Sequence, residues 1–232
     1  MPNVSVVIPA LNEEKVIAQA VRAIPPGTAS EIIVVDNGSV DRTAEEARGA
    51  GAAVVSEPAR GYGRACRAGV RAVSDDCEII VLMDADLSDD PCEMLLLIQP
   101  IVEQGYDFVL GSRILGRRET GSMSAAQVFG SRLASLLIRL FYGVRYTDMG
   151  PFRAIRKSAL ELLDMRQETY GWSIEMQTKA AARGLRVKEV PVTWRHRAAG
   201  QSKVAGTVSG SVRAGARIIW TILNVVLGET GQ

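Results

Sequence analysis

The sequence predicts an α/β fold with a doubly wound, mostly parallel sheet and helices on both of its faces. Strand-like and helix-like segments alternate over the first half of the chain, in the order that βαβ units require. The strand-like segments are continuously apolar rather than alternating, which is typical of strands covered on both faces. In such sheets the loops at the carboxyl ends of the strands gather along one edge, where ligands bind.

The individual elements follow from apolar spacing and turn residues. Residues 12–24 show apolar side chains at helical spacing, with Asn12 as the expected N-cap. Further helices are expected within residues 40–51, 61–75, 91–105 (interrupted at Pro100), 128–144, 173–184 and 211–227. Strands are expected within residues 4–8, 31–39, 52–58, 78–86, 107–113 and 186–197. Residues 147–163 are interpreted as a loop, a short strand and a helix.

The composition indicates one large domain. A chain of 232 residues with 47% hydrophobic residues is long and apolar enough for a sizeable core. We expect this domain to span residues 1–210, followed by an amphipathic helical tail at residues 211–232. The formal net charge of +1 argues against nucleic acid as a partner. Three cysteines without a CxxC pair, and a single histidine, argue against a disulfide framework and a zinc site, and favour a reducing cytosol.

The segment IIVLMDADLSDDP, residues 79–91, runs from a buried strand directly into a group of aspartates. Asp84 and Asp86 are separated only by Ala85, and two carboxylates this close repel each other unless a cation joins them. Oxygen ligands with open positions suit Mg²⁺ or Mn²⁺, which keep waters and bind phosphates. The pair is therefore interpreted as holding a divalent ion that neutralises a departing diphosphate. Solvated aspartates at a strand end are the alternative, and the position after a buried strand disfavours it.

These residues, together with others along the chain, resemble family 2 glycosyltransferases of the GT-A fold, closest to the dolichyl-phosphate mannosyltransferase-like branch. Eight motifs occur in order over about residues 4 to 205: VVIPALNEE, IIVVDNGSVDRT, GYGRACRAG, DADLSDDP, DFVLGSR, TDMGPFRAIR, GWSIEMQTKAAARG and EVPVTWRHRAAGQSK. One such motif can arise by chance, whereas eight in sequence are a strong signal. The resemblance implies a transferase that needs Mg²⁺ or Mn²⁺ and uses a nucleotide-sugar.

The resemblance implies a nucleotide-sugar pocket at the edge of the sheet, formed by Pro9, Ala10, Glu13, Asp36, Asp84 and Arg113. Glu13 also suits the first turn of a helix, whose dipole favours acidic residues, and Asp36 also suits an Asx-turn. The implied metal ligands are Asp84, Asp86 and Ser88. Ser88 stands where polyprenyl-phosphate enzymes can have a glutamine that contacts the metal. We therefore expect water or Ser88 itself to be the third metal ligand.

The resemblance also implies the residues at the reacting centre, with catalytic roles for Asp86, Arg113, Asp148 and Glu175. The guanidinium of Arg113 can grip a phosphate with two parallel hydrogen bonds; a surface salt bridge is the alternative. Asp148 belongs to a loop that flanks the sugar and acceptor. Glu175 corresponds to an acidic residue near the acceptor, which acts as general base for hydroxyl acceptors, whereas a phosphate acceptor needs none. A solvated helix position is the other interpretation of Glu175.

Binding of the acceptor or of a phosphate is expected of Arg153, Arg195, Arg197, Ser202 and Lys203. The last four form a late basic loop between small residues, which suits a lid that orders on binding. A solvated basic loop is the alternative. His196 lies in this run, but the inverting chemistry of the family needs no histidine.

The expected function is transfer of a hexose, with inversion, from a GDP-mannose- or UDP-glucose-type donor to a polyprenyl (dolichyl or undecaprenyl) phosphate. The alternatives are a transferase with a small soluble acceptor, a nucleotidyltransferase, and a non-catalytic nucleotide-sugar-binding protein. A nucleotidyltransferase usually has a glycine-rich basic loop after the first strand, where this chain has the acidic PALNEE.

The tail raises the question of a membrane. No signal peptide and no run of about 18 apolar residues is present, so we expect a cytoplasmic protein, at most peripheral to the inner face of the membrane. In residues 211–227, Arg213 and Arg217 precede an apolar run that contains Trp220. Such a helix suits a membrane interface, the protein core or a second subunit in an oligomer.

Overall fold

A computed structural model describes residues 2–199 and 208–229 of the chain. Its described strands form one sheet in the order β3-β2-β1-β4-β6-β5-β7. These are β1 (Val4–Ala10), β2 (Glu31–Asp36), β3 (Ala53–Ser56), β4 (Ile79–Leu82), β5 (Phe108–Ser112), β6 (Arg153–Arg156) and β7 (Val187–Pro191). β6 runs antiparallel to β4 and β5, and the other neighbouring pairs are parallel. The predicted α/β fold with a mostly parallel sheet is therefore confirmed.

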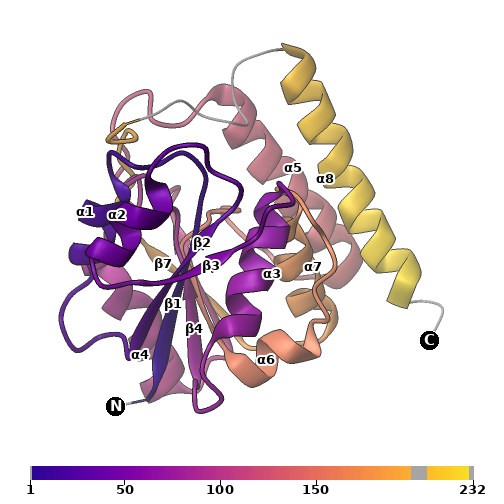
Figure 1. Cartoon of the computed structure of the whole chain (residues 1–232). Coiled ribbons are helices and arrows are strands. Elements are labelled where there is room, and N and C mark those ends of the chain that lie inside the picture. Colours follow the sequence, from indigo (N-terminus) through magenta and orange to yellow (C-terminus); the bar gives the residue numbers. More distant parts are fainter. Residues whose placement is uncertain (1, 200–207, 230–232) are drawn as a thin grey trace.

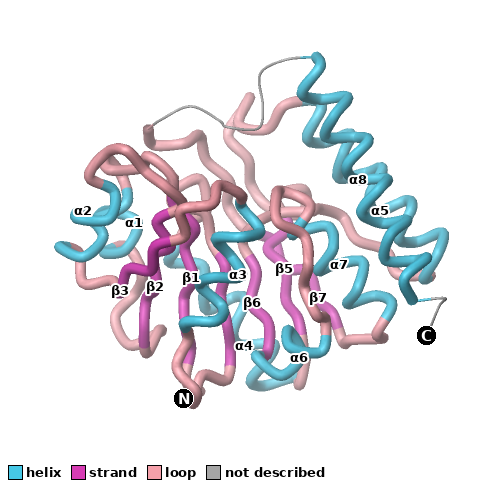
Figure 2. Tube along the Cα trace, turned by 45° about the vertical axis from the view of Figure 1, so that its right-hand side comes forward, coloured by secondary structure: helices cyan, strands magenta, loops and turns pink. Residues whose placement is uncertain are grey.

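Helices cover both faces of the sheet (Figures 1 and 2). One face carries α1 (Ile17–Arg22), α2 (Thr43–Gly49) and α4 (Met94–Gln104), which follows the short helix η1 (Pro91–Glu93). The other face carries α3 (Tyr62–Ala72), α5 (Ala125–Tyr142), α6 (Lys157–Leu162), α7 (Trp172–Ala182) and α8 (Val208–Glu229). Val6 and Val7 are consecutive in β1 and belong to the cores on opposite faces. Covering on both faces is the reason that the strands are continuously apolar.

The C-terminal helix α8 packs against other helices of the fold rather than standing away from them. It contacts α5 and α7, and its buried face presents Ile218, Ile222 and Val225. The division of the chain at residue 210 stays a prediction. Among residues 2–199 and 208–229 no helix is long and apolar enough to cross a membrane.

Three local predictions were wrong. Asn12 does not cap α1: it has a φ of 53°, and its side-chain oxygen accepts a hydrogen bond from the Val40 amide at 2.9 Å, which ties two loops together. Pro100 does not interrupt α4, because its buried ring packs in the core and the helix continues around the missing N–H. The last strand ends at Pro191 instead of residue 197, and Trp194 makes only isolated bridges to Asp89 and Arg118.

Candidate active site

The loops that follow β1, β2 and β4 lie at one edge of the sheet, because these strands are neighbours and run in parallel. Figure 2 shows β1 rising from the amino terminus toward this edge. Three predicted nucleotide residues end these strands: Pro9 and Ala10 lie in β1 and Asp36 ends β2. The Asp36 carboxylate accepts a hydrogen bond from the Ser39 amide, three residues on, at 3.1 Å, whereas the Asx-turn considered from the sequence would engage the amide two residues on.

The loop after β4 holds a cluster of three carboxylates, Asp84, Asp86 and Asp89. Asp86 and Asp89 are 3% and 0% exposed, and the Asp84 amide donates to Asp89 Oδ2 at 3.3 Å. Burial, together with the negative charge of Asp86, raises the pKa of Asp84 to about 7. Burial, with the negative charges of Asp84 and Asp86, raises the pKa of Asp89 well above its ordinary value. The loop therefore concentrates negative charge that the protein compensates only in part.

This cluster fits a divalent cation. Asp89 Oδ1 is buried and has no hydrogen-bond partner among the described residues, so unmet acceptor capacity lies inside the cluster. The donors are carboxylate oxygens, which Mg²⁺ and Mn²⁺ prefer. Within the described ranges, no group of three or more His, Cys, Asp or Glu side chains is arranged to hold an ion by itself. A metal held by Asp84 and Asp86 would therefore take its remaining ligands from water and from a substrate.

Ser88, the third predicted metal ligand, has a different contact in this structure. Its amide donates to Asp86 Oδ1 at 2.9 Å, and its hydroxyl donates to the same oxygen. These bonds fix the orientation of the Asp86 carboxylate and leave Oδ2 as the oxygen that pairs with Arg197. Ser88 thus orients the carboxylate of Asp86, and the roles of both residues as metal ligands stay predictions.

Arg113 and Asp148 form a buried bidentate pair beside the cluster. Arg113 donates from Nε to Asp148 Oδ2 at 2.6 Å and from Nη2 to Oδ1 at 2.8 Å. Burial opposes ionisation of Asp148, but the hydrogen bonds and the charge of Arg113 outweigh it and lower its pKa. The Arg113 guanidinium also lies over the ring of Trp194, 4.8 Å from its centroid. Asp148 and Trp194 together fix the position of the predicted phosphate-binding arginine.

Glu189 in β7 supports this pair, and sequence reasoning missed it. Its carboxylate accepts hydrogen bonds from the Thr147 amide at 2.9 Å and from the Asp148 amide at 3.2 Å. Burial outweighs these bonds and raises the pKa of Glu189. The sequence gave little signal for this, because Glu189 follows Lys188 in the strand VKEVP and resembles an ordinary charged strand position. Glu189 positions the loop that holds Asp148 against Arg113.

Arg153 is buried, and its guanidinium holds backbone segments together. Its side chain is 1% exposed, and its guanidinium donates to the carbonyl oxygens of Gly150, Pro151 and Ser173. Burial lowers its pKa. These bonds hold the Gly150–Pro151 turn against the start of α7. A phosphate contact of Arg153 stays a prediction that requires its donors to change partners.

Glu175 is not a solvated helix position, because it is buried and both of its oxygens are engaged. It accepts hydrogen bonds from the amides of Arg166 and Gln167 and pairs with Lys179 at 2.8 Å. The loop held in this way packs on the start of α3, where a Cβ at Gly63 would lie 2.1 Å from the Gln167 carbonyl oxygen. The contacts are those of a positioning residue, and a catalytic role stays a prediction.

The start of α3 reaches the carboxylate cluster through Tyr62. Burial, and then the negative charges of Cys66 and Asp84, raise the pKa of Tyr62 well above its ordinary value, which places Tyr62 near Asp84. The sequence predicted a helix start at GYGRACRAG, which is confirmed, but it gave no sign that Tyr62 lies near Asp84. The glycines on both sides of Tyr62 allow the close approach of the 166–168 loop.

The late basic loop closes over the carboxylates in this structure. Arg195 pairs with Asp90 at 2.5 Å. Arg197 pairs with Glu13 at 2.8 Å and with Asp86 at 2.9 Å. Two predicted members of this loop, Ser202 and Lys203, lie outside the described residues. The structure therefore brings Glu13, Asp86 and Arg197 together at one point.

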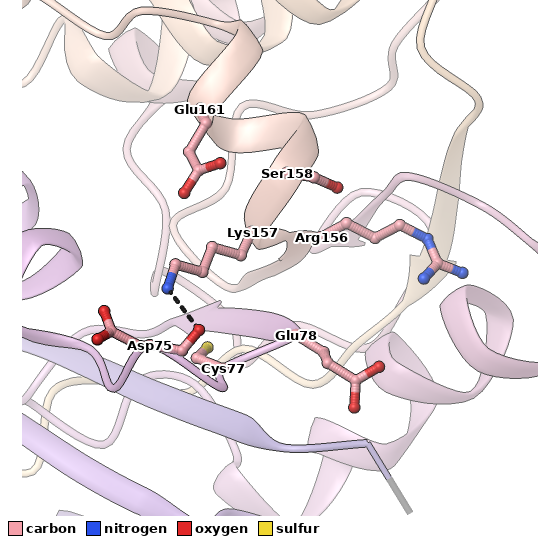
Figure 3. Close-up of a pocket in the computed structure, with 7 residues that line it drawn as sticks. All are labelled: Asp75, Cys77, Glu78, Arg156, Lys157, Ser158 and Glu161. Carbon is pink, nitrogen blue, oxygen red and sulfur yellow. Dashed lines mark hydrogen bonds between the residues drawn. The ribbon is translucent and has the colours of Figure 1, made fainter.

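A hollow lies at the opposite edge of the sheet from the carboxylate cluster. It has a volume of about 380 Å³, and Figure 3 shows the residues that line it: Asp75, Cys77, Glu78, Arg156, Lys157, Ser158 and Glu161. Lys157 Nζ is engaged there with the carbonyl oxygens of Ser74 and Asp75, both at 3.1 Å. The hollow adjoins the amino end of β4, so it is separate from the carboxylate cluster.

Comparison with known proteins decides the family. The model of Glycosyl transferase family 2 matches residues 5–163, which include the carboxylate cluster, Arg113 and Asp148. The chain belongs to this family. The predicted family membership is therefore confirmed, and the protein is a glycosyltransferase with the GT-A fold.

This family 2 glycosyltransferase matches several relatives over most of their length. It is 37% identical over 213 residues to an uncharacterized glycosyltransferase of Mycobacterium tuberculosis, covering 91% of this chain and 94% of the relative. It is 34% identical to the dolichyl-phosphate hexose transferase of Haloferax volcanii, covering 90% of each chain. Among solved structures it resembles glucosyl-3-phosphoglycerate synthase of M. tuberculosis, with a TM-score of 0.76, 25% identity, and coverage of 96% of this chain and 79% of that one.

Proposed function

We propose that this glycosyltransferase moves a hexose from a nucleotide-diphosphate sugar to a polyprenyl phosphate, with inversion at the anomeric carbon. The observation that supports this most is the buried carboxylate cluster flanked by Arg113 and Arg197. A cation bound to the carboxylates, together with the neighbouring arginines, would offset the negative charges of two phosphorylated substrates that bind side by side. The similarity to the dolichyl-phosphate hexose transferase over 90% of both chains supports a polyprenyl acceptor.

The chain's own residues contribute positioning and charge in this proposal. A divalent ion bound by Asp84 and Asp86 would supply charge neutralisation for the leaving diphosphate. Arg113, held by Asp148 and Trp194, presents fixed positive charge to a phosphate without reorganising. Mn²⁺ is the ion in the glucosyl-3-phosphoglycerate synthase complex, so Mn²⁺ is proposed here with Mg²⁺ as the second choice.

The contacts of Glu175 favour a phosphate acceptor over a hydroxyl acceptor. A hydroxyl nucleophile gains from a general base that removes its proton, whereas a phosphate oxygen is already anionic. Glu175 is the base suggested by the resemblance, but two backbone amides and Lys179 already engage it. An acceptor that needs no base therefore agrees best with this arrangement.

A small phosphorylated acceptor is the second candidate. The glucosyl-3-phosphoglycerate synthase structure holds UDP-glucose and phosphoglyceric acid together with Mn²⁺. Separate assays with a short-chain polyprenyl phosphate and with 3-phosphoglycerate, each with UDP-glucose and GDP-mannose, distinguish the two. Labelled sugar that partitions into organic solvent supports the proposal, and label confined to the aqueous product with 3-phosphoglycerate supports the second candidate.

Donor binding should appear as thermal stabilisation that depends on the metal. UDP or GDP at about 100 times its dissociation constant should stabilise the protein by roughly 2.7 kcal/mol in the presence of Mn²⁺. A chelator should remove this gain, because the ion bridges the diphosphate and the carboxylates. Differential scanning fluorimetry measures it. The absence of any nucleotide-dependent shift would contradict the proposed donor class.

We also propose that the outer surface of α5 and α8 contacts the membrane that holds such an acceptor. The two helices pack side by side (Figure 1), and we take their exposed apolar side chains together as one apolar surface. Its exposed members are Phe129, Leu136, Leu140, Phe141, Ile219, Trp220, Leu223 and Leu227. The basic residues Arg132, Arg139 and Arg217 belong to the same helices, which suits anionic lipid head groups.

This surface predicts binding to anionic vesicles. The double variant Leu140→Glu/Leu223→Glu should reduce binding at least about tenfold, because it replaces two apolar contacts with repelled charges. Co-sedimentation with phosphatidylglycerol vesicles measures it. Leu162→Glu is the matched control, since Leu162 is 61% exposed on α6, outside the surface. Equal losses in both variants would contradict the assignment.

A further inference from the structure

The guanidinium of Arg197 occupies the point where the carboxylate cluster faces the loop after β1. Nη1 lies 2.9 Å from Asp86 Oδ2, and Nη2 lies 2.8 Å from Glu13 Oε1. One planar fork therefore spans acids from two neighbouring strand ends. The Nε atom is buried and has no hydrogen-bond partner among the described residues, so one donor of the fork is unused.

The backbone around Arg197 is attached to the same loop that carries the carboxylates. The Arg195 amide donates to the Ser88 carbonyl oxygen at 2.9 Å, and the Ala198 amide donates to the Asp86 carbonyl oxygen at 3.0 Å. These two bonds bracket Arg197 and hold its Cα beside Asp86. The guanidinium can then change partners by side-chain rotation, without detachment of the loop.

Arg197 uses the oxygen of Asp86 that a metal would need. Asp86 Oδ1 already accepts the amide and hydroxyl of Ser88, so Oδ2 is the oxygen left for an ion. A divalent cation and a guanidinium repel each other at the same oxygen. Binding of the ion therefore requires Arg197 to leave Asp86, and an additional anion that receives the guanidinium makes this displacement more favourable.

We propose that Arg197 is an internal cation that exchanges with the divalent ion and moves to the donor diphosphate when that ion arrives. It partly neutralises Asp86 and Glu13 before the donor binds, and it makes binding of the ion and of the diphosphate cooperative. The inference rests on the proposed function in one respect, because it assumes that Asp84 and Asp86 bind the ion. Cooperativity of this kind is a coupling free energy between two ligands, and it acts on both equally.

The test is direct titration with Mn²⁺, in which electron paramagnetic resonance of the free ion reports binding without any turnover. Wild type, Arg197→Ala, Arg197→Lys and Arg195→Ala are each titrated without nucleotide, with saturating UDP and with saturating GDP. Arg195→Ala is the matched control: it removes the same charge from the same loop, but its side chain pairs with Asp90 and not with Asp86. Thermal unfolding of each variant shows whether it is folded.

Without nucleotide, Arg197→Ala should bind Mn²⁺ about tenfold more tightly than wild type, and Arg195→Ala should change the affinity much less. The ratio of Mn²⁺ affinities with and without the diphosphate should fall about tenfold in Arg197→Ala. The Mn²⁺ affinity of Arg197→Lys should lie between those of wild type and Arg197→Ala, since lysine keeps the positive charge but cannot contact two carboxylates with a planar guanidinium. Equal Mn²⁺ affinity in wild type and Arg197→Ala, or equal effects of the two alanine variants, would overturn the exchange and leave the proposed function standing. Absence of Mn²⁺ binding in every protein, with UDP and GDP alike, would overturn both.

Discussion

Replacement of Asp86 by asparagine should lower metal-dependent release of nucleotide from its sugar donor by about 10² to 10³-fold, because it weakens binding of the divalent ion that would neutralise the leaving diphosphate. Asparagine has nearly the same shape as aspartate and can still accept the bonds from Ser88, so the loop should keep its conformation. The measurement is the initial rate of nucleotide release from UDP-glucose or GDP-mannose with Mn²⁺, with and without the acceptor.

Asp90→Asn provides the control for this loss. Asp90 lies in the same loop, but its carboxylate caps the Cys92 amide and pairs with Arg195 instead of joining the buried cluster. Its replacement should affect the rate far less than that of Asp86. The Asp86 variant should also lose the Mn²⁺-dependent thermal shift with nucleotide. A fully active Asp86→Asn enzyme would refute the metal role of the cluster.

Replacement of Asp148 by alanine should reduce the free energy of unfolding by about 3–5 kcal/mol, since it leaves the buried Arg113 guanidinium without its carboxylate. An exposed pair serves as the reference: Asp164 and Arg166 are 63% and 78% exposed, so Asp164→Ala should stay within about 1 kcal/mol of wild type. Urea unfolding of the three proteins measures the difference. A loss below that of Asp164→Ala would show that the buried pair is not a stabilising element.

The same pair has a predictable dependence on pH. Arg113 lowers the pKa of Asp148 below its unfolded value of 3.8, so the ionised carboxyl stabilises the fold above that value. This contribution is lost as the pH falls through the lower folded pKa. The difference in unfolding free energy between wild type and Asp148→Ala should therefore be constant above about pH 5 and shrink only in stronger acid.

Much of the fold was predictable because its signals are local. Continuous apolar runs identified the buried strands, and residues such as Gly61 and Gly105 mark where helices begin and end. The chain order of the strands also predicted that Asp84 and Asp86 lie at the carboxyl edge of the sheet. The prediction failed at Asn12 and Pro100, where tertiary contacts outweighed the ordinary preferences of those residue types.

The sequence by itself therefore determined the family, the sheet and the aspartate pair at its edge, since each depends on short-range patterns. Only the tertiary structure decided the partners of the charged groups. Arg197 meets Glu13 across 184 residues, and Glu189 meets Thr147 across 42. Such pairs form because chain topology brings particular loops to the same edge, and burial then makes each charge depend on the partner that it finds there. No spacing along the chain encodes that Arg197, rather than Arg195 in the same loop, should lie on Asp86.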